Sequence, residues 1–311
     1  MTRQSSGPLS RARTFFDSDL WWSFKGDLGT VAAAVILLIF GGATLFAPAI
    51  AVHNPFDAAA IDLMDSLLPP LGYAEADSRF ILGTDDQGRD MLATILYGAR
   101  ISLFVGFSSV AFAMALGILL GLVSGFLGGR VDAVIMRIAD IQLAFPPILI
   151  ALLVDGIARG LLPRDLHGEI SIFVLVFAIG ISGWVQYART VRASTMVEKN
   201  KEYVLAAMVI GIGGRLLVTR HILPNVIGPT LVIATIHLAF AIILEATLSF
   251  LGVGVPPTTP SLGTLIRIGN EYLFSGEWWI TVFPGVALIV LVLSVNLIGD
   301  WLRDVFNPKL R

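Results

Sequence analysis

The sequence contains no cysteine and few charged residues. Without cysteine, the chain can form no disulfide, no thiolate-ligated zinc site and no thiol-based catalytic site. Charged residues make up only 14% of the chain, whereas hydrophobic residues make up 56% and the mean hydropathy is +0.82. A typical soluble domain carries roughly a quarter of its residues as charges. The composition therefore predicts a membrane protein, and the formal net charge of -2 gives no support to nucleic-acid binding.

The sequence signatures of common enzyme sites are also missing. There is no Gly-Lys pair, so the chain has no Walker A loop for ATP. The four histidines have no spacing typical of a metal site, and no Gly-x-Ser-x-Gly nucleophile elbow occurs. We therefore expect a chain that is not itself an enzyme, carries no cofactor or metal, and takes its energy from another subunit.

Long apolar segments predict an all-α polytopic membrane protein with six transmembrane helices, because a spanning helix needs about 20 apolar residues. The third span begins near Val131 and runs towards Pro146 and Pro147, and a polar connection over 155–169 follows it. The other expected spans cover 31–50, 101–127, 170–186, 227–251 and 279–298. After the fifth span, we expect a rigid non-helical loop over 252–260, which is rich in glycine and proline.

The remaining segments divide the chain as follows. We expect a cytoplasmic tail and an interfacial helix over 1–29, a first transmembrane helix over 30–51 and an external segment over 52–100. The membrane core is expected over 101–301, followed by a cytoplasmic tail over 302–311. In the second span, small residues recur every four positions, which predicts close helix packing. They are Ala113, Gly117, Gly121 and Gly125.

A polar interruption over 198–224 separates two of the apolar segments. We expect a short helix from Tyr203 to Ile210, with small side chains on its surface at Ala206 and Ala207. Gly211 can end this helix, because glycine is the usual residue just beyond a helix C-terminus. Pro224 then marks the start of the next helix, since proline fits into the first turn.

This interruption resembles the EAA loop of ABC-importer permeases. Leu205 stands where the family pattern has its first Glu, and His221 stands where it has Ile. In that family the loop forms a coupling helix that docks on the cytoplasmic ATPase, and an ordinary amphipathic loop helix is the alternative. The resemblance implies an ATPase-coupling role for Glu202, Tyr203, Ala206, Ala207, Gly211, Leu223 and Pro224.

A second stretch, 82–103, precedes the second span and is acidic at its start. It resembles the Gly-Thr-Asp-x-x-Gly-Arg-Asp signature of permeases from the dipeptide, oligopeptide and nickel importer group. We expect Asp85, Arg89 and Asp90 to cap and pin a turn at the outer mouth, with direct substrate contact as the alternative. The matching residues are Gly83, Thr84, Asp85, Gly88, Arg89 and Asp90.

Three ionisable residues fall inside apolar segments. Arg137 and Asp140 are three residues apart and can pair on one helix face. Glu245 stands alone in the fifth span, so we expect it to face the helix bundle or a partner subunit. The more specific alternative is that these three residues act in gating or line the transport pathway.

The resemblance covers most of 79–311 and implies a type I ABC-importer permease fold with both termini cytoplasmic. It also implies a multi-pass protein of a bacterial or archaeal cytoplasmic membrane, surrounded by lipid. The implied partners are a homologous permease, two ABC ATPase subunits or domains and an extracytoplasmic substrate-binding protein. Peptides are the default cargo, and nickel complexes, glutathione and opines remain open. An ion-driven secondary transporter and a membrane-embedded enzyme are the alternatives from other classes.

The distribution of basic residues agrees with this orientation. Of the 21 Lys and Arg residues, only six fall in segments expected outside, and the excess inside obeys the positive-inside rule. The EAA-like loop is thereby expected on the cytoplasmic side, where an ATPase can reach it. The six outside are Arg79, Arg89, Arg100, Arg159, Arg164 and Arg267.

Overall fold

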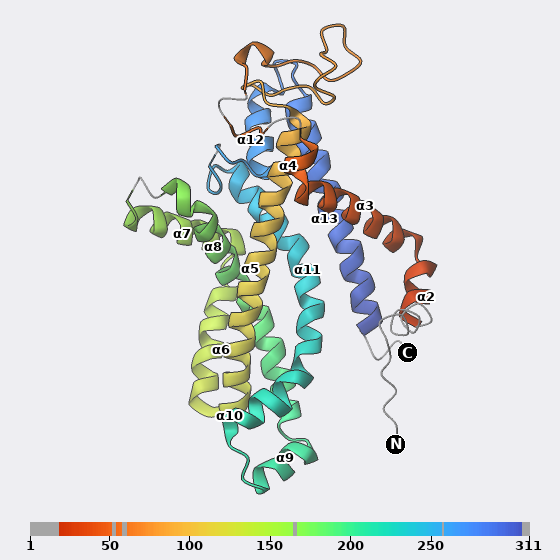
Figure 1. Ribbon diagram of the computed structural model, residues 1–311. Coiled ribbons are helices and arrows are strands. Elements are labelled where there is room, and N and C mark those ends of the chain that lie inside the picture. The colour runs from red at the N-terminus through yellow and green to blue at the C-terminus, as the bar shows by residue number, and fades with distance from the viewer. Residues whose placement is uncertain (1–18, 52–53, 58–60, 164–166, 257, 307–311) are drawn as a thin grey trace.

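The computed structural model describes residues 19–51, 54–57, 61–163, 167–256 and 258–306, and within these ranges the regular structure is helical (Figure 1). The predicted tail ahead of residue 19 and the last residues of the predicted C-terminal tail lie outside this part of the chain. The helices are α2 (Asp19–Gly26), α3 (Leu28–Leu45), α4 (Ala47–Ile50), η1 (Leu63–Asp65), α5 (Met91–Leu127), α6 (Gly129–Leu143), α7 (Pro147–Leu161), α8 (His167–Glu198), α9 (Glu202–Val209), α10 (Gly214–Leu217), η3 (Val218–Ile222), α11 (Leu223–Phe250), α12 (Leu262–Tyr272) and α13 (Trp279–Phe306).

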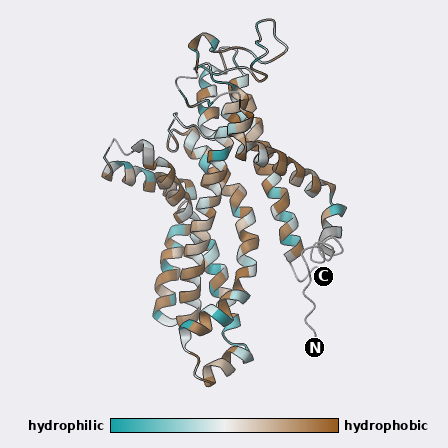
Figure 2. Cartoon of the chain, viewed as in Figure 1, coloured by the Kyte–Doolittle hydropathy of each residue, from teal (hydrophilic) through white to brown (hydrophobic). Residues whose placement is uncertain are grey.

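Five helical stretches in the described chain are long and apolar enough to cross a membrane, and α6 with α7 makes a sixth if the pair counts as one span. The five are Leu28–Leu45, Met91–Leu127, Ile170–Glu198, Gly214–Phe250 and Trp279–Val305. Figure 2 shows hydrophobic residues along most of α3 and along much of α5. The predicted all-α polytopic membrane fold is therefore confirmed.

The third span is not one straight helix. The pair α6 and α7 is bent by 98° at a short break, and Pro147 opens α7. Proline has no backbone N–H, and it also disfavours helical geometry at the residue before it, so Pro146 and Pro147 stop α6 from continuing. The polar connection expected over 155–169 is also wrong in its first half, because α7 continues to Leu161.

Helices α5 and α8 pack closely along the predicted stripe of small residues. A Cβ added at Gly121 would lie 2.6 Å from the backbone oxygen of Ala188, and one at Gly125 would lie 2.8 Å from that of Arg192. Neither position has room for a larger side chain. Because apolar burial alone does not hold helices together in lipid, this close backbone approach supplies the contact between the two helices.

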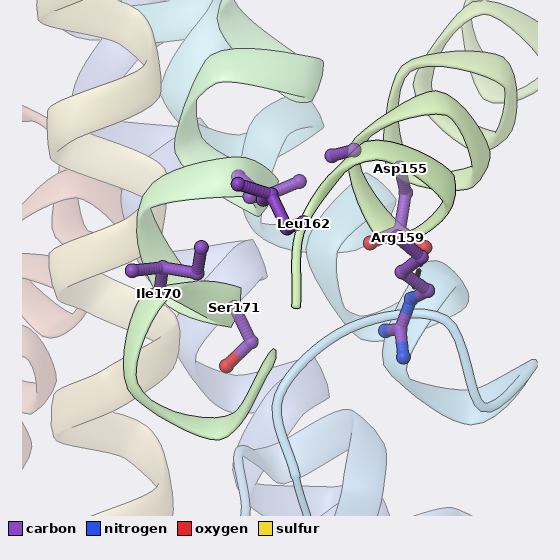
Figure 3. Close-up of a pocket in the computed structure, with 7 residues that line it drawn as sticks. Asp155, Arg159, Leu162, Ile170 and Ser171 are labelled. Carbon is purple, nitrogen blue, oxygen red and sulfur yellow. Dashed lines mark hydrogen bonds and ion pairs between the residues drawn. The ribbon is translucent and has the colours of Figure 1, made fainter. Parts of the chain in front are cut away.

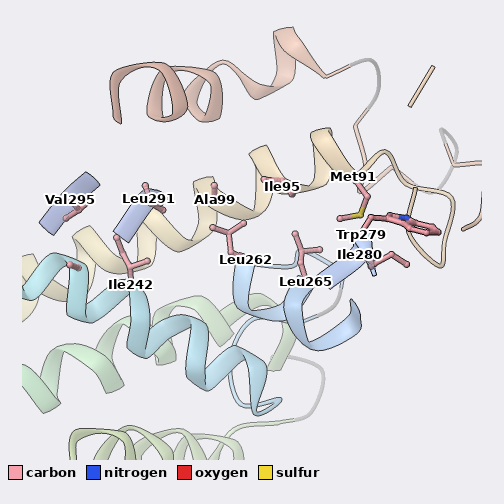
Figure 4. Packing of buried hydrophobic residues seen from close by; sticks show 11 residues of the cluster. Met91, Ile95, Ala99, Ile242, Leu262, Leu265, Trp279, Ile280, Leu291 and Val295 are labelled. Atoms are coloured by element: carbon pink, nitrogen blue, oxygen red, sulfur yellow. The ribbon is translucent and has the colours of Figure 1, made fainter. Parts of the chain in front are cut away.

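The core at one end of the bundle is built around α12, a helix that the sequence analysis did not predict. Figure 4 shows Met91, Ile95 and Ala99 of α5 close to Leu262 and Leu265 of α12. The expected non-helical segment is present before α12 over the described residues 252–256 and 258–260. The first turn of α12 is capped by the hydroxyl of Ser261, which accepts a bond from the amide of Thr264 at 3.4 Å. The same buried cluster includes Ile242 of α11 and reaches α13, and so joins four helices.

The first described helices lie at the edge of the bundle. Phe24 of α2 makes an edge-on ring contact with Trp301 of α13 at a centroid distance of 5.3 Å. Helix α3 runs away from the bundle at an angle (Figure 1), and only 17% of its residues are buried within the chain. Most of its apolar surface is therefore left for lipid or for another subunit.

Candidate functional site

The loop between α8 and α11 folds into the short helix α9 and then reverses at Gly211. Gly211 has a φ of +88°, a left-handed conformation that favours glycine. Its amide donates to the carbonyl of Met208 at 3.0 Å, and the amide of Ile212 donates to that of Ala207 at 3.1 Å. This pair of bonds is a Schellman motif, which satisfies carbonyls at the helix end. The predicted helix and its glycine stop are confirmed.

The two alanines of α9 face different sides. Ala206 is exposed, whereas Ala207 is buried in a cluster with Val204, Leu217 and Ile222. The expectation that both alanines lie on the surface is wrong for Ala207. Residues 204 and 207 are three positions apart and so share one helix face, which the cluster covers.

The outer face of α9 is apolar and uncovered. Leu205 is 47% exposed, Val209 is 88% exposed and Ile210 is 80% exposed. Figure 1 places α9 at the opposite end of the molecule from α12, beyond the end of the long helices. Apolar side chains that gather on a loop outside the apolar spans are typical of a protein interaction surface.

Tyr203 ties α9 to the two long helices on either side of it. Its hydroxyl donates to a carboxylate oxygen of Glu198, the last residue of α8, and accepts from Nδ2 of Asn225 in α11 at 3.0 Å. Lys201 also pairs with Glu198, at 2.7 Å between Nζ and Oε2. Glu198 and Asn225 were not predicted as site residues, although both are polar residues at the edges of apolar segments.

Pro224 lies in the first turn of α11, as expected, with Leu223 as the first residue of that helix. The helical path starts earlier than Pro224, however, because α10, the π-helical turn η3 and α11 run on continuously from Gly214. Glu202 lies in the first turn of α9, where a carboxylate is favoured by the helix dipole. All the predicted coupling residues therefore lie on this helical hairpin or on its first turn into the membrane.

The acidic signature before α5 forms a tight buried turn. Asp85 and Arg89 are 2% and 3% exposed in their side chains and pair at 2.6 Å between Oδ2 and Nε. The other carboxylate oxygen of Asp85 accepts from the amides of Gln87 and Arg89, both at 2.9 Å. Gly88 has a φ of +80°, which lets the chain turn back on the carboxylate. Contacts between residues of the turn itself therefore hold it in shape.

The rest of the signature joins that turn to its neighbours. Asp90 caps α5 by accepting from the amides of Leu92 and Ala93 at 3.2 and 3.1 Å. The hydroxyl of Thr84 donates to the carbonyl of Asp65 at 2.6 Å, and the carbonyl of Thr84 accepts from Nε1 of Trp279 at 3.0 Å. Gly83, with a φ of +77°, also adopts a glycine-favoured conformation. These contacts fasten the segment before α5 to the start of α13.

Asp140 does not pair with Arg137. Its carboxylate pairs instead with the guanidinium of Arg189 on α8, and both side chains are about half exposed. Arg137 lies exposed on α6. The expected pairing on one helix face is therefore wrong, because α8 offers a closer cation than the neighbouring turn of α6.

Glu245 is fully buried inside the bundle. One carboxylate oxygen accepts from the hydroxyl of Ser102 on α5 and the other from that of Ser249, both at 2.7 Å. Ser102 in turn accepts from the amide of Leu262, the first residue of α12, at 3.3 Å. The buried carboxylate therefore links α5, α11 and the start of α12.

Figure 3 shows a small cavity where α7 meets the start of α8, within the region expected to be a polar connection. Asp155 and Arg159 of α7 point towards each other there and pair at 2.6 Å, beside Ser171 of α8. The cavity measures about 10 Å³. Because one water needs roughly 10–15 Å³, this cavity cannot hold a solute.

Comparisons with known proteins agree with this architecture. Residues 117–311 match the model of a family described as binding-protein-dependent transport system inner membrane component. The chain is 38% identical to the dipeptide transport system permease protein DppC of Haemophilus influenzae, across 99% of both chains. It is 35% identical to the oligopeptide transport system permease protein OppC of Bacillus subtilis, across 94% of this chain and 90% of that one.

Among solved structures, an inward-facing form of the methionine ABC transporter MetNI matches with a TM-score of 0.54. The match has 20% sequence identity and covers 70% of this chain and 98% of that one, so it supports the fold alone. The family match covers more than half of this chain, and the relatives align over nearly its full length. The chain therefore belongs to the family of binding-protein-dependent transport system inner membrane components.

Proposed function

We propose that this chain is the permease subunit of an ATP-driven importer that carries peptides across the inner membrane. The single observation that supports the coupling role best is the uncovered apolar face of α9, formed by Leu205, Val209 and Ile210 beyond the end of the bundle. The dipeptide and oligopeptide permeases to which the chain is similar support peptides as the cargo.

The proposed assembly contains a second, homologous permease, two ABC ATPase subunits or domains and an extracytoplasmic substrate-binding protein. The exposed face of α9 docks on an ATPase, and its buried face keeps the helix attached to the bundle through Val204 and Ala207. An exposed apolar patch on a short helix suits a groove in a partner, because docking removes the patch from water.

The proposed orientation places α9 and both termini in the cytoplasm. The basic residues favour it, because most of them fall on the side of α9 under the expected division of the chain. The segment before α5 then lies outside, at the end of the molecule opposite α9 (Figure 1). In this orientation, the buried pair of Asp85 and Arg89 holds the outer segment in shape and does not itself contact cargo.

The proposed mechanism is alternating access. Nucleotide can drive a conformational change only if it favours one state of the permease pair over the other. Closure of the ATPases displaces the docked α9, and Tyr203 passes the displacement to α8 and α11 through Glu198 and Asn225. The two permeases then rock to expose the path first to one side and then to the other.

The test is co-purification of the tagged chain from gently solubilised membranes, using two matched variants. Val209 on α9 and Met64 on η1 are both apolar and both 88% exposed, but they lie at opposite ends of the molecule. We expect Val209→Glu to lose the ATPases and Met64→Glu to keep them. Equal recovery of ATPases with both variants, or peptide uptake by the chain without any ATPase, would refute the proposal.

A further inference from the structure

A cavity with four polar side chains in an otherwise mostly apolar wall lies at mid-length of three long helices. Its volume is about 260 Å³. Ser109 stands at the centre of α5, Ser182 and Gln186 near the centre of α8, and His237 near the centre of α11. Since these helices cross the membrane side by side, the cavity lies near the middle of the bilayer. The other residues of its wall are mostly apolar.

The polar side chains of this cavity have hydrogen-bonding capacity to spare. His237 Nε2 lies 2.7 Å from Oε1 of Gln186, and the ring of Tyr187 packs edge-on against the imidazole at 4.9 Å. The hydroxyl of Ser109 is buried, and no group in the described part of the chain bonds to it. An unpaired buried hydroxyl is destabilising, and this one is enclosed by protein, so a ligand in the cavity does not reach it without a rearrangement of its neighbours.

The polar residues in the cavity wall are poorly suited to direct contact with lipid. Gln186 is exposed at the chain surface, and His237 is partly exposed beside it. Polar residues at membrane depth normally face a protein interior or a water-filled path. Pro147 also contributes to the wall, at the 98° break between α6 and α7. Non-helical backbone at this depth is tolerated only where protein or a water-filled cavity covers it.

We propose that this cavity is a transit site that binds the peptide bonds of the cargo, an inference that rests on the proposed function. Gln186 has both a donor and an acceptor group, and the imidazole of His237 adds a further bond to a neutral amide. The cavity wall contains no Asp, Glu, Lys or Arg, so it offers no partner for a free charge. Hydrogen bonds to the cargo backbone do not depend on the side chains of the cargo, so the site accepts many different peptides. The small volume of the cavity suits brief binding of one or two cargo residues.

The chain contains no cysteine, so single cysteines report on this site without interference from others in the chain. In the complete transporter, Gln186→Cys is labelled with a membrane-impermeant methanethiosulfonate reagent during turnover, with and without a mixed dipeptide library. Ile243→Cys is the control, because Ile243 is 45% exposed on α11 but does not line the cavity. We expect Gln186→Cys to react, to be protected about threefold by peptide, and Ile243→Cys to stay unreactive.

Uptake kinetics give a second measurement. We expect Gln186→Leu to raise the KM for dipeptide uptake about three- to tenfold, as loss of one hydrogen bond predicts, while ATPase subunits still co-purify. Gln186→Asn, which keeps the amide, should recover part of the effect. Absence of uptake by the wild-type transporter would refute the proposed function and with it the transit site, whereas a change confined to the variants bears on the site alone.

Two results would overturn the transit site in an active transporter. One is that Gln186→Cys stays as unreactive as Ile243→Cys in every nucleotide state, which means that lipid or the partner permease covers the cavity. The other is that peptide leaves the labelling rate unchanged and that Gln186→Leu leaves KM unchanged, which means that cargo passes elsewhere.

Discussion

Substitution of Gly211 by valine tests the coupling role of α9 most directly. The φ of +88° at Gly211 costs an L-residue about 1–2 kcal/mol, and a β-branched residue falls at the upper end of that range. No atom lies within 4 Å of a Cβ built at this position, so the whole cost lies in the backbone. The substitution therefore perturbs the Schellman turn without a clash in the core.

The expected size of the effect follows from the length of α9. This helix has 8 residues, whereas an isolated helix is marginal below roughly 12–15 residues, so α9 depends on its cap and on its buried face. A penalty of about 2 kcal/mol shifts the equilibrium between formed and unformed turn by roughly 30-fold. We expect ATP-dependent peptide uptake and coupled ATPase activity to fall about tenfold, while membrane insertion is unchanged.

Gly213 provides the matched control for this experiment. Its φ is -62°, which any L-residue adopts, and nothing lies within 4 Å of an added Cβ. Gly213→Val should therefore transport normally, and Gly211→Asn should lie between the two variants, since Asn visits the left-handed region most readily after Gly. Uptake is measured in reconstituted vesicles at matched protein levels. Wild-type uptake by a fully inserted Gly211→Val protein would refute the reasoning.

Three further variants test the fold around the site. Asp85→Asn leaves the buried Arg89 uncompensated and should cost about 3–5 kcal/mol of stability, measured as a lower Tm in detergent; an unchanged Tm would contradict the buried pair. Gly121→Val should separate α5 from α8 and lower the Tm, whereas Gly41→Val, with open space around its Cβ, should not; equal Tm values would argue against close packing. Burial, and then the charge of Asp85, raise the pKa of Asp86, so the folded state binds this proton more tightly than the unfolded state does. The stability that this tighter proton binding contributes is fully present below about pH 4, the ordinary pKa of Asp. It is lost as the pH rises from there through the raised pKa of the folded state. Asp86→Asn should therefore raise the Tm at pH 7 but not below pH 4, and a gain at both would point to another cause.

Local signals in the sequence were sufficient for most of the fold. Apolar runs of bilayer length gave the spans, and Gly211 marked the end of α9 because no other residue adopts its φ at so little cost. The small-residue stripe of α5 likewise predicted a helix contact, although not that α8 makes it. Each of these features depends on residues that lie close together in the chain.

The features that were missed depend on partners far apart in the sequence. Asp140 had a cation three residues away, but the fold brings Arg189, 49 residues away, into contact with it. Helix α12 follows a segment rich in glycine and proline, and its core residues Leu262 and Leu265 gain their burial from α5 and α13. Tertiary contacts decided both of these features. The bend at Pro146 has a local cause in the two prolines, and it was hidden because the residues on both sides of it are apolar.

The site at α9 and the cavity at mid-membrane are connected by two helices of unequal stiffness. Gln186 lies 12 residues before Glu198 on α8, about 18 Å at 1.5 Å per residue, and this stretch contains no proline. On α11, by contrast, Pro229 lies between Asn225 and the cavity, where it removes one helical hydrogen bond. The glycine contacts leave no room for α5 to slide on α8, so the two helices must move together. We therefore expect a displacement of α9 to reach the cavity mainly through α8 with α5, while α11 and the break between α6 and α7 absorb the difference.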